Sequence, residues 1–132
     1  MRKKLSNKET ENQSLMSQIF QIIEKQGSKS LEQARKRLFA IKIENEEALK
    51  GLELYSRNWK DTIHPAILSL SYEAVSDSPF DITNMQIMIL FLTAAMDIHD
   101  DVMDKSMTKG GKPTLYGKYG EDLAILIGDA LL

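Results

Sequence analysis

Apolar side chains recur every three or four positions through most of this 132-residue chain, and the strict apolar–polar alternation typical of strands is absent. Residues 1–14 are polar and are expected to be irregular. The first helical pattern follows them, and Gly27-Ser28 is expected to end it. The apolar positions of this first pattern are Leu15, Ile19, Ile22 and Ile23.

Two further helices are predicted before residue 80. Ser30 is a suitable N-cap for a second helix that runs to about Tyr55. Pro65 suits the first turn of a third helix over residues 64–76, and Asp77-Ser78-Pro79 then forms a turn. The residues expected to face inward from the third helix are Ile67, Leu68, Leu70 and Val75.

The most apolar segment, residues 82–105, predicts a long helix that Asp81 caps at its N-terminus. It is apolar nearly all round as far as Met96, so we expect it to be central and buried. Residues 106–117 contain three glycines and a proline, which predicts a mobile loop, and a last helix is expected from about Lys118. The methionines expected to fill the core or line a cavity are Met85, Met88, Met96, Met103 and Met107.

Three carboxylates fall within five residues near the end of the long helix, at Asp100, Asp101 and Asp104. In a helix, Asp100 and Asp104 lie one turn apart on one face, and Asp101 is rotated by about 100° from Asp100. Like charges this close repel one another unless water or a cation neutralises them. Oxygen ligands on a rigid helix suit Mg²⁺, which often bridges carboxylates to a substrate phosphate. The alternative interpretation is a solvated acidic face near a helix end.

The composition is that of a soluble globular protein of one domain, or of part of a larger one, with 42% hydrophobic and 27% charged residues. A net charge of −2, with no aromatic residues among the basic clusters, gives no reason to expect nucleic acid as a partner. The chain has no cysteine, which excludes disulfides and thiolate chemistry. The N-terminus lacks the apolar core of a secretory signal, and the longest apolar stretch is too short to form a transmembrane segment. A cytoplasmic location is therefore expected.

The segment from Ile98 to Leu132 resembles the trans-isoprenyl diphosphate synthases, also known as polyprenyl synthetases. The resemblance is strong over residues 82–132 and weaker over residues 60–81. The motifs on which it rests are Asp100-Asp101-Val102-Met103-Asp104, Gly111-Lys112-Pro113-Thr114, Tyr119-Gly120 and Gly128-Asp129-Ala130-Leu131-Leu132.

The resemblance implies an all-α fold, a helical bundle of the isoprenoid synthase type around a central cavity, of which this chain holds the first half. Residues 1–28 are then an N-terminal extension or helix, and residues 29–132 are the N-terminal half of the domain. The family's C-terminal half, with its second aspartate-rich motif, is not reached before the chain stops in an apolar run. We therefore expect an incomplete chain or one that needs a partner, as a homodimer or a heterodimer.

The family joins an allylic diphosphate to isopentenyl diphosphate through ionisation, attack of the double bond on the cation and loss of a proton. By resemblance, Asp100, Asp101 and Asp104 are the catalytic residues and bind Mg²⁺, which neutralises the charge that develops on the pyrophosphate leaving group. Lys109 stands at the first arginine of the family's Arg-Arg-Gly triplet and is expected to contact the allylic diphosphate. The small Ala95, five positions before the first aspartate, implies a product of C20 or longer.

Four positions depart from the family pattern. The second arginine of the triplet is Gly110. The lysine and arginine that hold isopentenyl diphosphate in the family align with Asp61 and His64, and Thr93 stands where the family has His or Gln. A carboxylate at a phosphate contact would repel the diphosphate, so these contacts look degraded.

Other cations can take over the lost contacts. Lys60 can substitute if the register slips by one residue, and His64 can contribute when protonated, while Lys105 and Lys112 are alternatives nearby. The candidate substrate-binding residues are thus Lys109, Lys60, His64 and Thr93. Two functions besides chain elongation stay open: a non-catalytic prenyl-synthase-like subunit, and a terpene-synthase-like enzyme that ionises its substrate without isopentenyl diphosphate.

Overall fold

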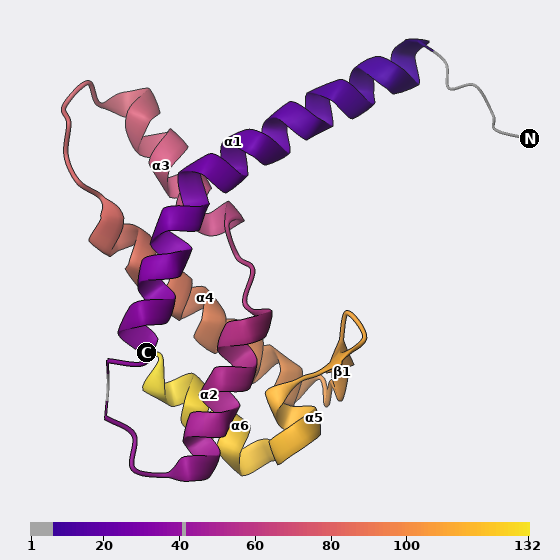
Figure 1. Cartoon of the computed structure of the whole chain (residues 1–132), viewed down its shortest axis with the longest axis vertical. Helices are drawn as coiled ribbons and strands as arrows, with labels where there is room; N and C mark the ends of the chain where they lie inside the picture. The colour runs from indigo at the N-terminus through magenta and orange to yellow at the C-terminus, as the bar shows by residue number, and fades with distance from the viewer. Residues whose placement is uncertain (1–6, 41) are drawn as a thin grey trace, which may run out of the picture.

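The computed structural model describes residues 7–40 and 42–132, and nearly all regular structure in them is helical (Figure 1). The predicted all-α fold class is therefore confirmed. Of the segment expected to be irregular, residues 7–14 are helical instead, and residues 1–6 lie outside the described residues. The helices are α1 (Asn7–Leu38), α2 (Glu46–Asn58), α3 (Ile63–Val75), α4 (Thr83–Met103), α5 (Leu115–Tyr119) and α6 (Glu121–Ala130). Strands β1 (Thr108–Lys109) and β2 (Lys112–Pro113) pair antiparallel in a short hairpin.

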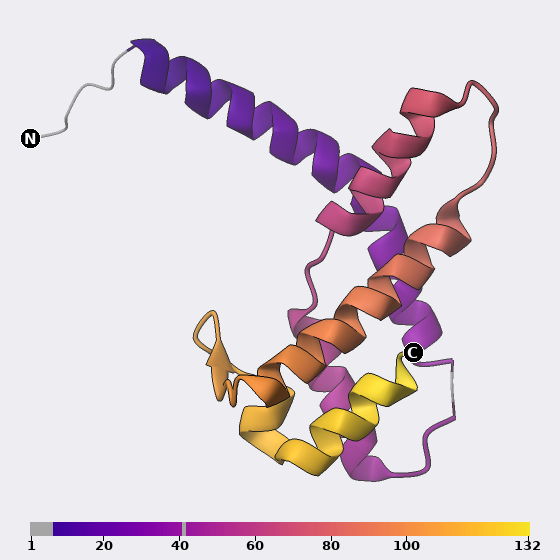
Figure 2. The same ribbon diagram turned by 180° about the vertical axis from the view of Figure 1, so that it is seen from behind.

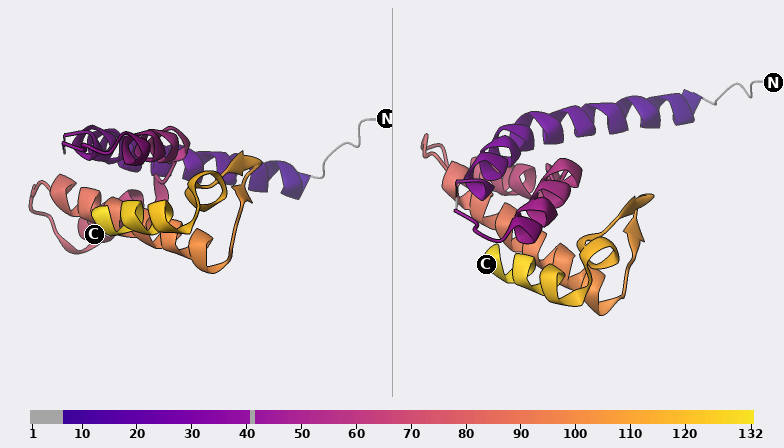
Figure 3. Two further views of the ribbon diagram at one scale, coloured as in Figure 1. Left: turned by 90° about the horizontal axis from the view of Figure 1, so that it is seen from below. Right: turned by 60° about the horizontal axis from the view of Figure 1, so that its bottom comes forward.

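Helix α4 is the element against which most of the others pack. Helices α1 and α3 contact it and each other, and α6 lies beside it, as Figure 2 shows from behind. Helix α2 packs on α6 and α5, so that α1 and α2 lie on one side of the layer that α4 and α6 form (Figure 3). The largest fully buried side chains include Ile87, Leu90 and Ile98 of α4 and Ile127 of α6. Within the described residues, none of the helices is both long and apolar enough to cross a membrane.

The first helix is longer than the sequence predicted, because Gly27-Ser28 does not end it. Helix α1 continues through this pair and changes direction partway along its length (Figure 1), and Gly/Ser pairs are common sites of helix bends. Gly27 is buried, and a Cβ atom there would collide with the backbone of Thr62. The glycine thus permits close packing of α1 on the segment that enters α3, and the prediction of a helix end was wrong.

The predicted helix from Ser30 to about Tyr55 is divided between α1 and α2. Ser30 lies inside α1, where its buried hydroxyl donates a 2.7 Å hydrogen bond to Oε1 of Gln86 instead of capping a helix. Helix α2 begins after Asn45, whose side-chain oxygen accepts a hydrogen bond from the N–H of Ala48 at 2.9 Å. This local cap, which the sequence analysis missed, starts a new helix where a continuous one was expected.

Helix α3 confirms the predicted helix to within one residue at each end, but a different face of it is buried. The residues buried in α3 are Pro65, Ala66 and Ser69, whereas Ile67, Leu70 and Val75 are exposed. Because α3 is apolar on several sides, its sequence does not select the face that packs on α1 and α4. The prediction of inward residues was wrong for these three for that reason, whereas Leu68 is half-buried.

Helix α4 confirms the long central helix, but its N-cap residue is Ile82 and not Asp81 as predicted. Asp81 lies one residue earlier, where its Oδ1 accepts a hydrogen bond from the N–H of Thr83 at 2.9 Å. The buried residues of α4 lie on one side only. The methionines expected in the core or in a cavity wall are all exposed, with exposed fractions of 51% for Met85, 72% for Met88, 62% for Met96, 81% for Met103 and 58% for Met107. In the described structure the expectation that these side chains are buried is therefore wrong.

The segment predicted as a mobile loop, residues 106–117, contains the hairpin and the start of α5. Gly110 and Gly111 form its turn with φ values of +57° and +76°, a backbone region that glycine adopts without steric cost. Thr114 ties its ends together, because its Oγ1 donates to the carbonyl of Ser106 at 2.5 Å and accepts from the N–H of Gly117 at 2.8 Å. The hairpin thereby holds the side chains of its two strands beside α2 and α4.

Candidate functional site

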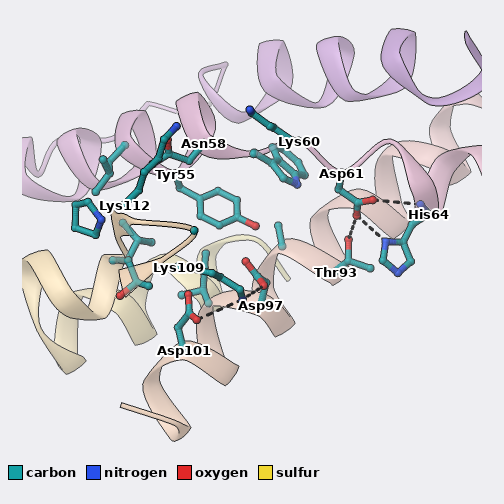
Figure 4. A pocket seen from close by; sticks show the side chains of 18 residues that line it. Tyr55, Asn58, Lys60, Asp61, His64, Thr93, Asp97, Asp101, Lys109 and Lys112 are labelled. Carbon is teal, nitrogen blue, oxygen red and sulfur yellow. Dashed lines mark hydrogen bonds and ion pairs between the residues drawn. The ribbon is translucent and has the colours of Figure 1, made fainter. Parts of the chain in front are cut away.

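A cavity of about 520 Å³ lies between α2, the connection to α3, the second half of α4 and the hairpin (Figure 4). Its volume is in the range of small-molecule sites. Three lysines and three aspartates are among its lining residues, namely Lys60, Lys109, Lys112, Asp61, Asp97 and Asp101. The apolar part of its wall includes Leu54, Trp59, Ile98 and Leu115. A charged mouth and an apolar wall suit a ligand that is polar at one end and hydrocarbon at the other.

Lys109 reaches from β1 to two carboxylates of α4. Its Nζ lies 2.5 Å from Oδ1 of Asp97 and 3.4 Å from Oδ1 of Asp101 (Figure 4). Asp97 and Asp101 are one helical turn apart, so both side chains point to the same side of α4. The sequence analysis missed Asp97, although its spacing of four residues before Asp101 was a usable signal.

The electrostatics of this group follow from burial and from the ion pairs. Asp101 is 8% exposed, and burial raises the pKa of its carboxyl, with Lys109 opposing the rise. The hydrogen bond to Asp97 raises the pKa of the Lys109 ammonium, so the lysine stays charged at neutral pH. The ammonium of Lys109 is thus paired with the carboxylates of Asp97 and Asp101, and its positive charge is compensated by them.

A second group forms where α3 begins. The carboxylate of Asp61 accepts hydrogen bonds from the Thr93 hydroxyl at 3.1 Å and from the His64 N–H at 3.2 Å, and its Oδ2 lies 2.7 Å from Nδ1 of His64. The structure therefore brings together three positions that depart from the family pattern (Figure 4). Their polar atoms are engaged with one another, and Asp61 brings negative charge to the place where the resemblance predicts a diphosphate contact.

The three aspartates of the motif do not share one environment. Asp101 lines the cavity, whereas Asp100 and Asp104 are exposed and lie outside its lining. Among residues 7–40 and 42–132, no set of three Asp, Glu, His or Cys side chains is placed to hold a metal ion. The expectation that all three aspartates stand at one cavity mouth is not met in the described structure, and their role as Mg²⁺ ligands stays a prediction.

One other sequence expectation concerns Ala95, which is fully buried in the core and does not line the cavity. Trp59 is 5% exposed and lines the cavity, with Phe91 stacked on its ring. His99 packs against Gly128, and its Nε2 lies 3.3 Å from Oδ1 of Asp129. This contact joins the aspartate motif to the last motif of the chain.

Tyr55 and Asn58 are cavity residues that the sequence analysis did not single out. Figure 4 shows the Tyr55 ring extending into the cavity between the two groups of charged residues. Burial raises the pKa of its hydroxyl, and Asp97, Asp61 and Asp101 raise it further, so Tyr55 is a neutral hydrogen-bond donor. Asn58 ends α2 and accepts a hydrogen bond from Nζ of Lys112 at 2.8 Å. No pattern in the sequence marked either residue.

Comparisons with known proteins agree with the motifs. The family model for polyprenyl synthetases matches residues 60–132, which is more than half of the chain. A probable farnesyl diphosphate synthase of Sinorhizobium fredii is 34% identical over 108 residues, 80% of this chain and 32% of that protein. A short chain isoprenyl diphosphate synthase of Methanothermobacter thermautotrophicus is 38% identical over 69 residues, 52% of this chain and 21% of that protein.

The chain belongs to the polyprenyl synthetase family. The matched region contains α3, α4, the hairpin, α5 and α6. The alignments cover about a third or less of the length of these curated relatives. No solved structure matches the chain significantly.

Proposed function

We propose that this chain takes part in an Mg²⁺-dependent prenyl transfer, in which an allylic diphosphate ionises and condenses with isopentenyl diphosphate. The observation that supports this best is the position of Lys109. In the matched family segment it projects into a cavity that has Asp101 on one side and an apolar wall on the other. The diphosphate would lie at the charged mouth, and the isoprenoid tail would lie along Leu54, Ile98 and Leu115.

The donor set fits Mg²⁺ that is shared with substrate phosphates. The residues that would hold the ion are Asp100, Asp101 and Asp104, all oxygen donors from one end of α4. The ammonium of Lys109 already lies 3.4 Å from Oδ1 of Asp101, and a positive charge at this place stabilises the ionised form of the buried carboxylate. Mg²⁺ bound by one or two carboxylates takes its other ligands from water and phosphate, so a complete protein cage is not required. When bound, the ion would supply charge neutralisation to the leaving pyrophosphate.

The chain's own residues would position the substrate and keep water away. The cavity wall formed by Trp59 and Leu115 offers no nucleophile to an allylic cation. The ammonium of Lys109 would leave Asp97 to bind the diphosphate, because it cannot hold its present ion pair with Asp97 and contact the substrate at the same time. The product length of C20 or more that Ala95 suggested now rests on resemblance alone, since Ala95 does not line the cavity.

A second candidate function is favoured by the Asp61–His64–Thr93 group. These side chains are bonded to one another at the position where the family holds isopentenyl diphosphate. A chain that lacks this contact would ionise an allylic diphosphate without elongating it, or would serve as a non-catalytic subunit of a heterodimer. A homodimer is the other assembly that the family resemblance suggests.

The test is an assay of the 132-residue chain with Mg²⁺ and geranyl, farnesyl or geranylgeranyl diphosphate, each with and without isopentenyl diphosphate. Release of pyrophosphate and formation of a longer product, both requiring isopentenyl diphosphate, are the expected results. Release without isopentenyl diphosphate favours the ionising enzyme. No release under any condition contradicts an enzymatic role and favours the subunit.

Variants of Lys109 connect the assay to the cavity. Lys109→Met is expected to weaken binding of the allylic diphosphate by about tenfold, because a charge-assisted contact is lost. Lys109→Arg keeps the charge and is expected to retain most of the binding. Lys118→Met removes an equal charge outside the cavity lining and is the matched control. Equal effects of Lys109→Met and Lys118→Met would argue against a specific contact.

A further inference from the structure

We propose that the hairpin of β1 and β2 is a lid over the cavity, held closed by two lysine side chains that bind opposite walls. The inference goes beyond the proposed function, because it does not depend on which ligand enters the cavity. The hairpin forms one wall of the cavity (Figure 4). The residues that it contributes to the lining are Lys109, Gly110, Lys112, Pro113 and Thr114.

The base of the hairpin is fixed to the helices. The N–H of Thr114 donates a hydrogen bond to the carbonyl of Met107 at 3.1 Å. The N–H of Ser106 donates to the carbonyl of Asp101 in α4 at 2.8 Å. A Cβ atom at Gly117 of α5 would collide with the backbone of Met107, so α5 packs tightly on this base. The chain therefore enters and leaves the hairpin at positions that α4 and α5 determine.

Beyond its base, the hairpin has little support from the helices. All residues of its two strands are exposed, and a Cβ atom added at Gly110 or Gly111 would meet no other atom within 4 Å. The tip projects away from the helices (Figures 1 and 2). In the part of the chain that the structure describes, the hydrogen bonds and ion pairs that join residues 108–113 to α2 or α4 all come from lysine side chains.

These two lysines share one face of the hairpin. Lys109 and Lys112 are paired directly across the antiparallel strands, so their side chains lie on the same side. Nζ of Lys109 lies 2.5 Å from Oδ1 of Asp97 in α4. Nζ of Lys112 donates to Oδ1 of Asn58, at the end of α2, at 2.8 Å. Like charges at opposite positions repel each other, and here each ammonium has its own partner on a different wall.

The contacts that close the lid are accessible to solvent. The side chains of Lys109 and Asp97 are 56% and 42% exposed, and exposed ion pairs contribute little to stability and are screened by salt. The second carboxylate near Lys109, that of Asp101, is farther away at 3.4 Å. The contact between Lys112 and Asn58 is exposed and involves only one charge. Opening therefore breaks weak contacts at the strands, while the hydrogen bonds at the base remain.

Trp59 makes the lid measurable, because it is the only tryptophan in the sequence, lines the cavity and is 5% exposed. The test is quenching of its fluorescence in the 132-residue chain by acrylamide, a neutral solute whose access does not depend on protein charge. We expect Asp97→Asn and Lys109→Met each to raise the quenching constant by about twofold, as suits loss of an exposed ion pair. The double variant should not exceed Lys109→Met, because both changes remove the same contact.

Two further measurements separate an opened lid from a loosened fold. Between about 0.01 M and 1 M salt the Debye length falls from about 30 Å to about 3 Å, so quenching of the wild type should increase with salt. Lys109→Met should respond less, since its ion pair is already absent. Asn58→Asp gives Lys112 a charged partner and is expected to reduce quenching, which partial unfolding cannot do.

Lys118→Met is the matched control, since Lys118 lies in α5 and outside the cavity lining. It should leave both the quenching constant and its dependence on salt at the wild-type level. Melting curves identify any variant that does not fold. Quenching that is unchanged in folded Asp97→Asn and Lys109→Met, that rises equally in Lys118→Met, or that rises in folded Asn58→Asp would each overturn the inference.

Discussion

Gly128 of α6 lies so close to the imidazole ring of His99 in α4 that no Cβ atom fits between them. The next residue, Asp129, places Oδ1 3.3 Å from Nε2 of the same ring. Helix α4 therefore contacts the Gly-Asp motif of α6 through His99, directly before the aspartate motif. Because His99 precedes Asp100 directly, the docking of α6 fixes the part of α4 from which the carboxylates project.

Gly128→Ala is therefore expected to destabilise the chain by about 1 to 3 kcal/mol, the range typical of an overpacked contact. The free energy of unfolding is measured by urea denaturation. His99→Ala opens space at the same contact, so the double variant should lose less stability than the two single losses combined. Strict additivity of the two losses would show that Gly128 and His99 do not share this contact.

Asn45→Ala should destabilise the chain by about 1 kcal/mol, because the N–H of Ala48 at the start of α2 loses its acceptor. Asn45→Asp keeps a side-chain oxygen in the same place and should retain most of the stability. Thermal unfolding followed by circular dichroism compares the two variants. A loss that is equal in both variants would contradict the capping role.

Asp81 gives a prediction about pH. Hydrogen bonds from Thr83 lower the pKa of its carboxyl below the ordinary value of 3.8. Because the pKa in the folded state is the lower one, the stabilisation is fully present above about pH 4 and is lost as the pH falls through the folded-state pKa.

The measurement is urea denaturation of the wild type and of Asp81→Ala between pH 2 and pH 7. The difference in stability between them should be largest near neutral pH and should shrink in acid. A difference that stays constant across this range would contradict an ionised Asp81 that accepts the hydrogen bonds of Thr83.

Asp100 and Asp104 permit a test in which metal binding is separated from folding. Both side chains are exposed, so Asp100→Asn and Asp104→Asn should change the free energy of unfolding by less than about 0.5 kcal/mol. If they hold Mg²⁺, each variant should weaken the Mg²⁺-dependent binding of geranyl diphosphate by at least about tenfold. Calorimetry with Mg²⁺ and with EDTA measures this effect.

Asp77→Asn, an exposed change in the loop before α4, is the control for removal of one negative charge. Affinity that is independent of Mg²⁺ in the wild type, or equal in all three variants, would rule out the metal role of the motif.

The amino-acid sequence by itself determined the helical class, the long helix α4 and the location of the motifs. These properties depend on local signals: the spacing of apolar residues, the oxygen of Asp81 before a helix, and Gly110 and Gly111 in a turn. The resemblance, which rests on the aspartate motif and the three motifs that follow it, also predicted the family that the comparisons show. Each of these signals is contained within a few residues along the chain.

Only the tertiary structure decided which faces are buried and which side chains meet. Gly27 was expected to end a helix, yet it lies within α1, at a place where the backbone of Thr62 occupies the space that a side chain would need. Asp97 joined the candidate site, and Asp104 stayed outside it, because the hairpin brings Lys109 to one side of α4. Burial and ion pairing depend on which surfaces come together in space, and residues distant in sequence supply those surfaces.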